Sequence, residues 1–297
     1  MDPRRRALLA ALAAGATPLP GYAAMPPLSK KIPATGELLP VIGLGTWQAF
    51  DVRGDTAALR EVLASFAAMG GRVLDSSPMY GAAESVVGDL VDALGVRDKL
   101  FLATKVWTSG RAEGIRQMET SFKRMRVQRM DLLQVHNLVD VETHTRTLLE
   151  MKAAQKTRYI GITHYTASAH TEVERRLRAA QYDFLQINYS LAERNAEKAL
   201  LPLAQAQNVA VIANRPFGEG ALFRRVKGKP LPSWAAELGI DSWAQYFLKW
   251  IVSHPAVTCA IPGTGNPAHM KDNLGAGRGA LPDAAARRRM AAHYESL

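Results

Sequence analysis

The chain has 297 residues, of which 47% are hydrophobic and 22% are charged, and its formal net charge is +10. This is an ordinary globular composition, and it excludes a membrane-spanning helix because no apolar run reaches the ~20 residues that such a helix needs. The length suits one large domain, since α/β barrels routinely place ~250 residues around one core. The single cysteine, Cys259, excludes an internal disulfide.

The N-terminal stretch MDPRRRALLAALAAGATPLPGYAAM has three arginines, a weakly hydrophobic Ala-rich run, then prolines and small residues. This order is typical of an export signal, and the arginines can supply the pair that the twin-arginine route requires. We therefore expect a signal peptide over residues 1–24, cleaved near Ala23 or Ala24, a mature domain over residues 25–297, and a periplasmic protein. The alternative is an N-terminal tail on a cytoplasmic protein.

After this stretch, residues 30–43 (KKIPATGELLPVIG) have apolar residues on both sides of a turn-forming ATGE and predict a small hairpin. Short apolar runs rich in β-branched residues then recur at 41–46, 72–77, 100–105, 131–136, 158–163, 184–188, 209–214 and 258–263. Amphipathic helical segments separate them, for example residues 55–70, 112–126 and 241–254.

Eight alternating strand and helix units favour a closed (β/α)8 TIM barrel in the α/β class over a doubly wound sheet. We expect the hairpin to cap the bottom of this barrel. The longer gap before the last run predicts an extra helix before the eighth strand.

Polar residues occur at the C-terminal ends of several predicted strands, namely Asp75, Lys105, His136, Gln186 and Asn188. Any one of them could be a structural residue, such as a helix cap or a satisfied core histidine. The first three are separated by 30 and 31 residues, which is one strand and helix unit each. They are therefore predicted to face the same mouth, where barrels build their active sites.

A tyrosine, Tyr80, follows the second strand within the stretch SSPMYG, which begins directly after Asp75. A tyrosine is a weak acid, with a pKa near ~10, but a nearby ammonium such as that of Lys105 stabilises its phenolate and is expected to lower this pKa. Asp75 can keep Lys105 protonated, and His136 can hydrogen-bond the oxygen that receives the proton. Such a set delivers a proton to a carbonyl oxygen, and a nicotinamide would supply the hydride of a carbonyl reduction.

Seven stretches resemble the aldo/keto reductase family: TGELLPVIGLGTW, Asp75 with the following SSPMYG, LATKVW, DLLQVH, RYIGIT, LQINYS and IPGTGNPAHMKDNL. The resemblance covers the chain after the predicted signal. It implies an NADP(H) cofactor extended across the barrel mouth and a catalytic tetrad of Asp75, Tyr80, Lys105 and His136, with Tyr80 as the general acid.

The resemblance also implies cofactor-binding positions. These are Thr163, His164, Gln186, Asn214, Arg215, Pro216, Gly220, Gly263, Thr264, His269, Asp272 and Asn273. Several depart from the usual pattern: Thr163 and His164 stand where a Ser-Asn pair is usual, and Asn214 stands where an aromatic often stacks on the nicotinamide. Gly263 and His269 replace a Lys and an Arg that some members use for the 2′-phosphate, so NADP is expected and NAD remains possible.

Four residues are expected to line a substrate funnel for a small aldehyde or ketone: Trp47, Met79, Trp107 and Tyr189. The alternative for the tryptophans is loop packing at the barrel rim. We expect no metal ion, because no His-x-His or comparable ligand set follows a strand. The basic stretches 122–129 and 285–290 suit solvated helix faces, and no nucleic-acid motif accompanies them.

Three other functions share parts of this pattern. A cofactor-sensing regulatory subunit would keep the tetrad but turn over slowly. A Schiff-base lyase would need a neutral lysine, which a paired Asp75 opposes, and a metal hydrolase lacks ligands. We expect a monomeric carbonyl reductase with no nucleic-acid partner and no membrane insertion after signal cleavage.

Overall fold

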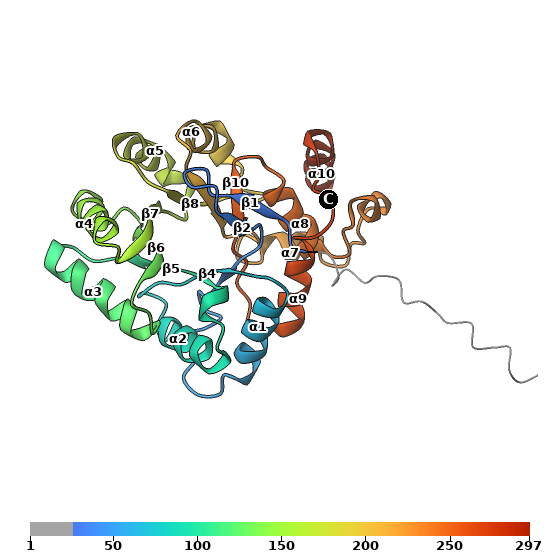
Figure 1. The fold of residues 1–297 in the computed structure, drawn as a ribbon. Helices are drawn as coiled ribbons and strands as arrows, with labels where there is room; N and C mark the ends of the chain where they lie inside the picture. Colours follow the sequence, from blue (N-terminus) through green and yellow to red (C-terminus); the bar gives the residue numbers. More distant parts are fainter. Residues whose placement is uncertain (1–25) are drawn as a thin grey trace, which may run out of the picture.

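The computed structural model describes residues 26–297, and the predicted signal over residues 1–24 lies outside the described residues. Eight parallel strands, β3 to β10, pair in sequence order, and bridges from Ile42 to Ala260 and from Gly45 to Gly263 join the first strand to the last. The sheet therefore closes on itself, and Figure 1 shows the helices arranged around it. The predicted (β/α)8 barrel is confirmed.

The barrel strands are short and each is followed by a helical connection. They are β3 (Leu44–Gly45), β4 (Val73–Asp75), β5 (Phe101–Val106), β6 (Met130–His136), β7 (Thr157–Thr163), β8 (Phe184–Asn188), β9 (Ala210–Asn214) and β10 (Val257–Ala260). The α-helices are α1 (Ala57–Ala68), α2 (Ala83–Leu94), α3 (Arg111–Arg124), α4 (Val141–Ala153), α5 (His170–Ala179), α6 (Leu200–Ala206), α7 (Ala221–Val226), α8 (Trp243–Val252), α9 (Pro267–Gly275) and α10 (Ala284–Ser296).

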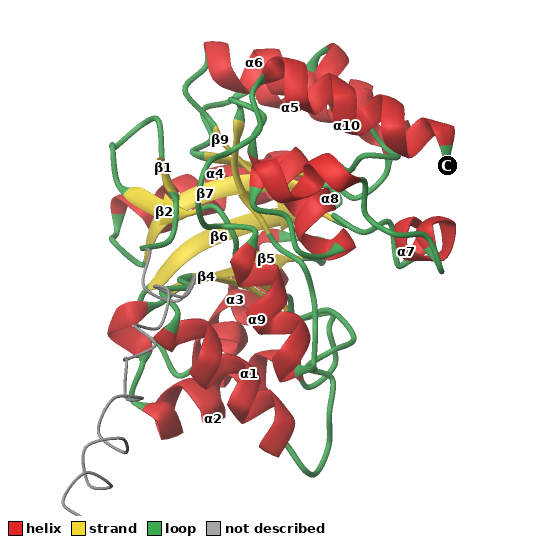
Figure 2. Cartoon of the chain, turned by 90° about the vertical axis from the view of Figure 1, so that its right-hand side faces the viewer, coloured by secondary structure: helices red, strands yellow, loops and turns green. Residues whose placement is uncertain are grey.

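Short 3-10 turns complete the connections at η3 (Arg97–Lys99), η4 (Ala167–Ala169), η5 (Asn195–Lys198) and η6 (Ser233–Leu238). Between β9 and β10 the chain forms α7, η6 and α8, so the predicted extra helix before the eighth strand is confirmed. In Figure 2, α7 lies at the end of the strands opposite to the hairpin.

The predicted hairpin is formed by β1 (Ser29–Lys31) and β2 (Leu38–Pro40), which pair antiparallel. Its apolar residues Ile32 and Leu39 are fully buried and belong to the cluster that fills the barrel interior, with Phe101 and Tyr159. The hairpin therefore closes the N-terminal end of the barrel, which we call the base. We call the C-terminal end, where the strands lead into the longer loops, the mouth.

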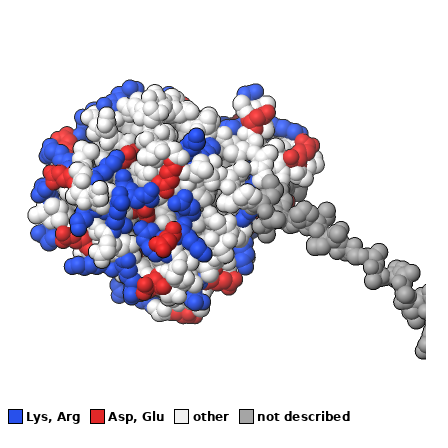
Figure 3. Space-filling model, in the orientation of Figure 1, with Lys and Arg blue, Asp and Glu red and all other residues white. Residues whose placement is uncertain are grey.

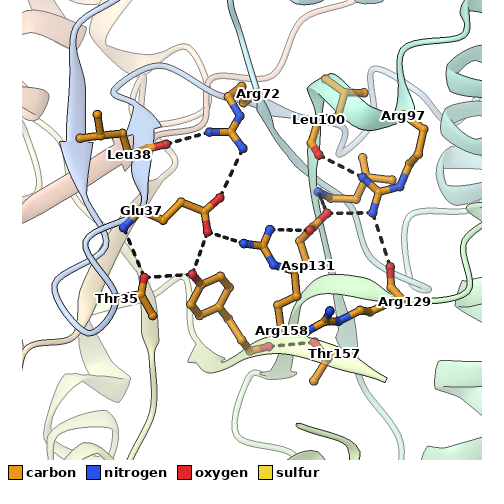
Figure 4. Close-up of polar contacts among 12 residues, drawn as sticks. Thr35, Glu37, Leu38, Arg72, Arg97, Leu100, Arg129, Asp131, Thr157 and Arg158 are labelled. Atoms are coloured by element: carbon orange, nitrogen blue, oxygen red, sulfur yellow. Dashed lines mark hydrogen bonds and ion pairs between the residues drawn. The ribbon is translucent and has the colours of Figure 1, made fainter. Parts of the chain in front are cut away.

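The base is held by a polar network that Figure 4 shows in close-up. Glu37 of the hairpin accepts hydrogen bonds from Arg72 and Arg158, and Asp131 accepts from Arg158 and from Arg97. The two carboxylates are thus bridged by one guanidinium. Figure 3 shows acidic side chains among the basic ones near the middle of the face seen in Figure 1.

Side chains alternate between the barrel interior and the helix layer, because successive residues of a strand point to opposite faces. On β5, Phe101 and Ala103 belong to the interior cluster, and Lys105 continues the same face. On β6, Leu132 belongs to it, and Gln134 and His136 follow. The interior therefore changes from apolar at the base to polar at the mouth.

Candidate active site

A cavity of about 650 Å³ opens at the mouth. It is lined by residues of the strand ends, of the loops that follow them and of α7: Gly45, Thr46, Trp47, Gln48, Asp75, Met79, Tyr80, His136, Asn137, Thr163, Tyr165, Gln186, Asn214, Arg215, Pro216, Phe217, Glu219, Gly220, Phe223, Ile261 and Gly263. The volume lies in the range of small-molecule and cofactor sites.

At the bottom of the cavity, Lys105 and Asp75 form a buried ion pair. Lys105 Nζ donates to Asp75 Oδ2 at 2.6 Å and to the Ser76 carbonyl at 2.7 Å, and the two side chains are 0% and 3% exposed. The second carboxylate oxygen, Oδ1, accepts from Gln186 Nε2 at 2.8 Å and from Gln134 Nε2 at 3.2 Å. Both charges are thus paired and hydrogen-bonded, as buried ions require.

This pairing decides the protonation state of the lysine. Burial by itself lowers the pKa of Lys105, but the Asp75 carboxylate and the Tyr80 oxygen outweigh burial and hold the pKa above its ordinary value. Lys105 is therefore an ammonium at neutral pH, and its pairing disfavours the neutral amine that a Schiff-base lyase needs.

Tyr80 lies beside this ion pair, with Lys105 Nζ 5.0 Å from the centroid of its ring. Burial raises the pKa of Tyr80 above its ordinary value, while the Lys105 ammonium lowers it by less. The prediction of a lowered tyrosine pKa is thus wrong in its net direction, because removal from water costs the phenolate more than the ammonium returns. The Lys105 ammonium does lower the pKa of Tyr80, as expected, but by less than burial raises it.

His136 ends β6 and faces Tyr80, with ring centroids 6.1 Å apart and planes at 87°. Its Nδ1 forms a hydrogen bond of 3.2 Å with Ser77 Oγ. Burial, Lys105 and His164 lower the pKa of His136 to about 3. His136 is therefore neutral at neutral pH. Asp75, Tyr80 and His136 line one cavity, and Lys105 lies fully buried behind it, bonded to Asp75.

Of the predicted cofactor residues, seven line this cavity: Thr163, Gln186, Asn214, Arg215, Pro216, Gly220 and Gly263. Gln186 Oε1 accepts from Thr163 Oγ1 at 3.2 Å, so the two side chains are joined at the strand ends. Asn214 Oδ1 and Arg215 Nε are buried without hydrogen-bond partners. Unpaired polar atoms of both kinds at the cavity wall suit a polar ligand that carries donors and negative charge.

The other five predicted cofactor residues do not line the cavity. His164 stacks on Tyr165 with ring centroids 5.6 Å apart, and its Nδ1 accepts the Tyr165 backbone N–H at 3.0 Å. Thr264 and Asn273 are buried, and His269 is exposed on α9. Asp272 accepts hydrogen bonds from Ser242 and Gln245 at 2.8 Å each, which ties it to α8.

Two of the four predicted substrate residues, Trp47 and Met79, line the cavity and are 46% and 41% exposed. Trp107 is outside its lining, and its backbone is bonded to Gln117. Tyr189 is fully buried and packs on Trp250 in the helix layer. The prediction that Tyr189 lines the funnel is wrong, because its side chain packs into the helix layer. The place of Trp107 in the funnel stays a prediction.

Three polar residues at the mouth were not predicted from the sequence. Gln134 lies two positions before His136 and so faces the same side of β6, which strand alternation could have revealed. Ser77 belongs to the stretch that carries Tyr80, but no pattern assigned it a role. Tyr165 follows β7 and is 45% exposed at the cavity wall, and no pattern in the sequence marks it.

Asn188, expected with the other strand-end residues, has its amide hydrogen-bonded to His170 and Glu193 instead of facing the cavity. Within residues 26–297 there is no group of three or more His, Cys, Asp or Glu side chains placed to hold a metal ion. Over the same range, no helix is long and apolar enough to cross a bilayer.

The family model described as "Aldo/keto reductase family" matches residues 41–292, which is most of the chain and all eight barrel strands. The chain belongs to the aldo/keto reductase family. Among curated proteins, this reductase is 30% identical over 257 residues to methylglyoxal reductase YeaE of Escherichia coli, covering 82% of this chain and 88% of that one.

Solved structures of the family share the fold. An aldo-keto reductase from Klebsiella pneumoniae in complex with NADPH superposes with a TM-score of 0.76 at 26% identity, covering 91% of this chain and 96% of that one. A second structure of an aldo/keto reductase from Klebsiella pneumoniae, in complex with NADP and acetate, has a TM-score of 0.73 at 27% identity and covers 87% of this chain and 93% of that one. The chain therefore shares its barrel fold with these two structures.

Proposed function

We propose that this aldo/keto reductase is an NADP(H)-dependent oxidoreductase that reduces small aldehydes and ketones to alcohols, with Tyr80 as the proton donor. Family membership supports the reaction class, and the nucleotides bound by the two Klebsiella pneumoniae structures support the cofactor. The observation that carries the proton donor is the contact of Tyr80 with a buried, protonated Lys105 at the cavity.

The chemistry follows from the protonation states. Bound NADPH would supply the hydride to the carbonyl carbon. Tyr80 keeps its proton until the substrate oxygen becomes basic, because burial raises its pKa. When the proton leaves, the phenolate forms beside the Lys105 ammonium, which stabilises it without moving.

Neutral His136 is suited to orient the substrate. A neutral imidazole can donate one hydrogen bond to the carbonyl oxygen without competing with Tyr80 as an acid. Because its pKa is about 3, it stays in this form across the range in which the enzyme would work.

The cavity wall fits the nicotinamide end of the cofactor. Thr163, Gln186 and Asn214 lie together at the ends of β7, β8 and β9 and carry the amide and hydroxyl groups that recognise a carboxamide. Arg215, with its unpartnered Nε, would face the phosphates. We expect NADPH to bind more tightly than NADH. The residue expected to meet the 2′-phosphate is His269, whose side chain is exposed on α9.

The test is a matched pair of tyrosine variants. Tyr80→Phe is expected to lower turnover by at least about 100-fold, the contribution of a positioned general acid, while the dissociation constant of NADPH changes little. Tyr182→Phe is the control, because its hydroxyl bonds Thr145 in the helix layer, away from the cavity. Assays should include methylglyoxal, the substrate that the name of the Escherichia coli relative gives.

The same two variants distinguish the proposed reductase from a second candidate, a cofactor-sensing regulatory protein. A regulatory protein would bind NADPH tightly but show negligible turnover on every carbonyl in a panel, in the unmodified protein as well as in Tyr80→Phe. Turnover of the unmodified protein that Tyr80→Phe abolishes would exclude it.

For location, we propose twin-arginine export to the periplasm, on the basis of residues 1–24 alone. Replacing Arg4, Arg5 and Arg6 together with Lys should leave an uncleaved protein in the cytoplasm. Normal export of that variant would indicate the general secretory route, and absence of cleavage in the unmodified protein would support a cytoplasmic tail.

A further inference from the structure

Ser77 contacts both groups that the proposed function directs at the substrate oxygen, yet the proposed steps do not use it. Its side chain is fully buried. Its Oγ lies 3.2 Å from His136 Nδ1, and its carbonyl accepts the Tyr80 backbone N–H at 3.0 Å. The residue therefore links the turn that carries the tyrosine to the strand that carries the histidine.

The partners of the Ser77 hydroxyl indicate which way its hydrogen bond to His136 runs. The oxygen also accepts the Met79 backbone N–H at 3.4 Å, and in the described part of the chain His136 Nδ1 is the only acceptor within reach of the hydroxyl proton. A buried hydroxyl that keeps its proton unpaired is unfavourable. Donation to Nδ1 satisfies it.

The consequence lies on the other ring nitrogen. A neutral imidazole carries one proton, so a ring that accepts at Nδ1 must carry its proton on Nε2. His136 is held neutral here by burial and by Lys105. With Nδ1 occupied by Ser77, Nε2–H is the donor left for a ligand in the cavity that His136 lines.

We propose that Ser77 is a positioning residue that holds His136 as the Nε2–H tautomer, so that the ring donates to the carbonyl oxygen which Tyr80 protonates. The tautomer follows from the contacts of Ser77, whereas the identity of the acceptor rests on the proposed function. The preceding serine, Ser76, has a different partner: its Oγ accepts a hydrogen bond from Thr46 Oγ1 at 2.9 Å. Of the two adjacent serine hydroxyls, only that of Ser77 contacts His136.

The direct test is nitrogen NMR of the full chain labelled with ¹⁵N-histidine. His136 is assigned by the loss of its signals in His136→Gln, or in His136→Asn if the first variant does not fold. We expect an unprotonated Nδ1 and a protonated Nε2 at pH 7 in the unmodified protein. A protonated Nδ1 would overturn the proposal without any variant of Ser77.

Ser77→Ala should convert this spectrum to that of exchanging tautomers, whereas Ser76→Ala, the adjacent buried serine, should leave it unchanged. In kinetics, Ser77→Ala should lower kcat about five- to tenfold, the effect of one hydrogen bond, with the NADPH dissociation constant unchanged. Ser77→Thr, which keeps the hydroxyl, should restore most of kcat. A merely structural serine would lower stability but leave the ring spectrum as it was.

These outcomes separate the two proposals. If the ring spectrum is as expected but Tyr80→Phe keeps its turnover, the tautomer stands and the proton donor is wrong. If Ser77→Ala has full kcat and an unaltered spectrum, Ser77 does not position His136, whatever Tyr80 does.

Discussion

The mouth and the base of the barrel both carry paired, ionised side chains at the ends of strands, but they differ in what covers these pairs. At the base, Glu37 and Asp131 are surrounded by Arg72, Arg97 and Arg158, and the hairpin covers the end of the barrel. At the mouth, one ion pair lies under an open cavity. Charged side chains at strand ends thus occur at both ends of the barrel, but only at the mouth do groups such as Tyr80 and His136 line a cavity where a ligand can reach them.

The electrostatics of the two ends follow from this difference. The guanidinium groups at the base are about one third exposed, so water screens them and each pair contributes modestly. The Lys105–Asp75 pair is screened by protein alone, and each partner depends on the other. The mouth thus holds groups whose protonation responds strongly to neighbours, which is what proton transfer requires.

The largest expected effect is at the mouth. Lys105→Met leaves the Asp75 carboxylate buried and unpaired, so we expect a loss of about 3–5 kcal/mol in the free energy of unfolding, together with loss of turnover. Urea unfolding and carbonyl reduction assays measure the two.

Its control is the double variant Asp75→Asn with Lys105→Met. It removes both charges and should recover much of the stability but none of the activity. Equal stability of the single and double variants would mean that the Asp75 charge is solvated and that the two ends of the barrel are alike.

A smaller effect on stability, and none on chemistry, is expected at the base. Asp131→Asn keeps an oxygen for the Leu102 N–H but weakens the contacts with Arg97 and Arg158. We expect a loss of about 1.5–3 kcal/mol in the free energy of unfolding, the range for hydrogen bonds to charged groups, with kcat unchanged. A tenfold fall in kcat in the folded variant would show that the base and the mouth are coupled.

Acid should destabilise the protein through its buried histidines. The folded pKa values of His136 and His254 are about 3 and about 4, against 6.5 in the unfolded chain, so the unfolded state takes up protons first. Their stabilising contribution is complete above pH 6.5 and is lost as the pH falls from there toward about 4 for His254 and about 3 for His136.

His136→Gln should therefore flatten the dependence of unfolding free energy on pH between 6.5 and 4, and His254→Gln should flatten it further. Thermal or urea unfolding at several pH values in this window measures it. An unchanged pH dependence in both variants would mean that folding does not lower the pKa of these histidines.

The smallest effects test the cavity wall. Met79→Ala should raise KM for apolar carbonyls about tenfold or less, because it removes part of the lining. Trp107→Ala, at a similar exposure but outside the lining, should change KM little. A rise in KM in Trp107→Ala that equals or exceeds the rise in Met79→Ala would show that Trp107 lines the substrate funnel.

The sequence by itself determined the barrel, the hairpin at its base and the meeting of Asp75, Lys105 and His136. Eight strand and helix units close in only a few ways, and residues one unit apart on parallel strands must reach the same end. The same residues pointed to Tyr80 beside Lys105, the family resemblance implied its role as the general acid, and the structure places it at the same cavity.

Only the tertiary structure decided the rest, because it depends on contacts between residues far apart in the chain. Burial of Tyr80 raised its pKa where the sequence suggested a fall, since desolvation is a property of the packed site. The Tyr189 side chain packs on Trp250 in the helix layer. The Ser77 hydroxyl forms a hydrogen bond with Nδ1 of His136, which lies 59 positions away in the chain. Side-chain direction after a strand ends follows no period, so these placements had no signal in the sequence.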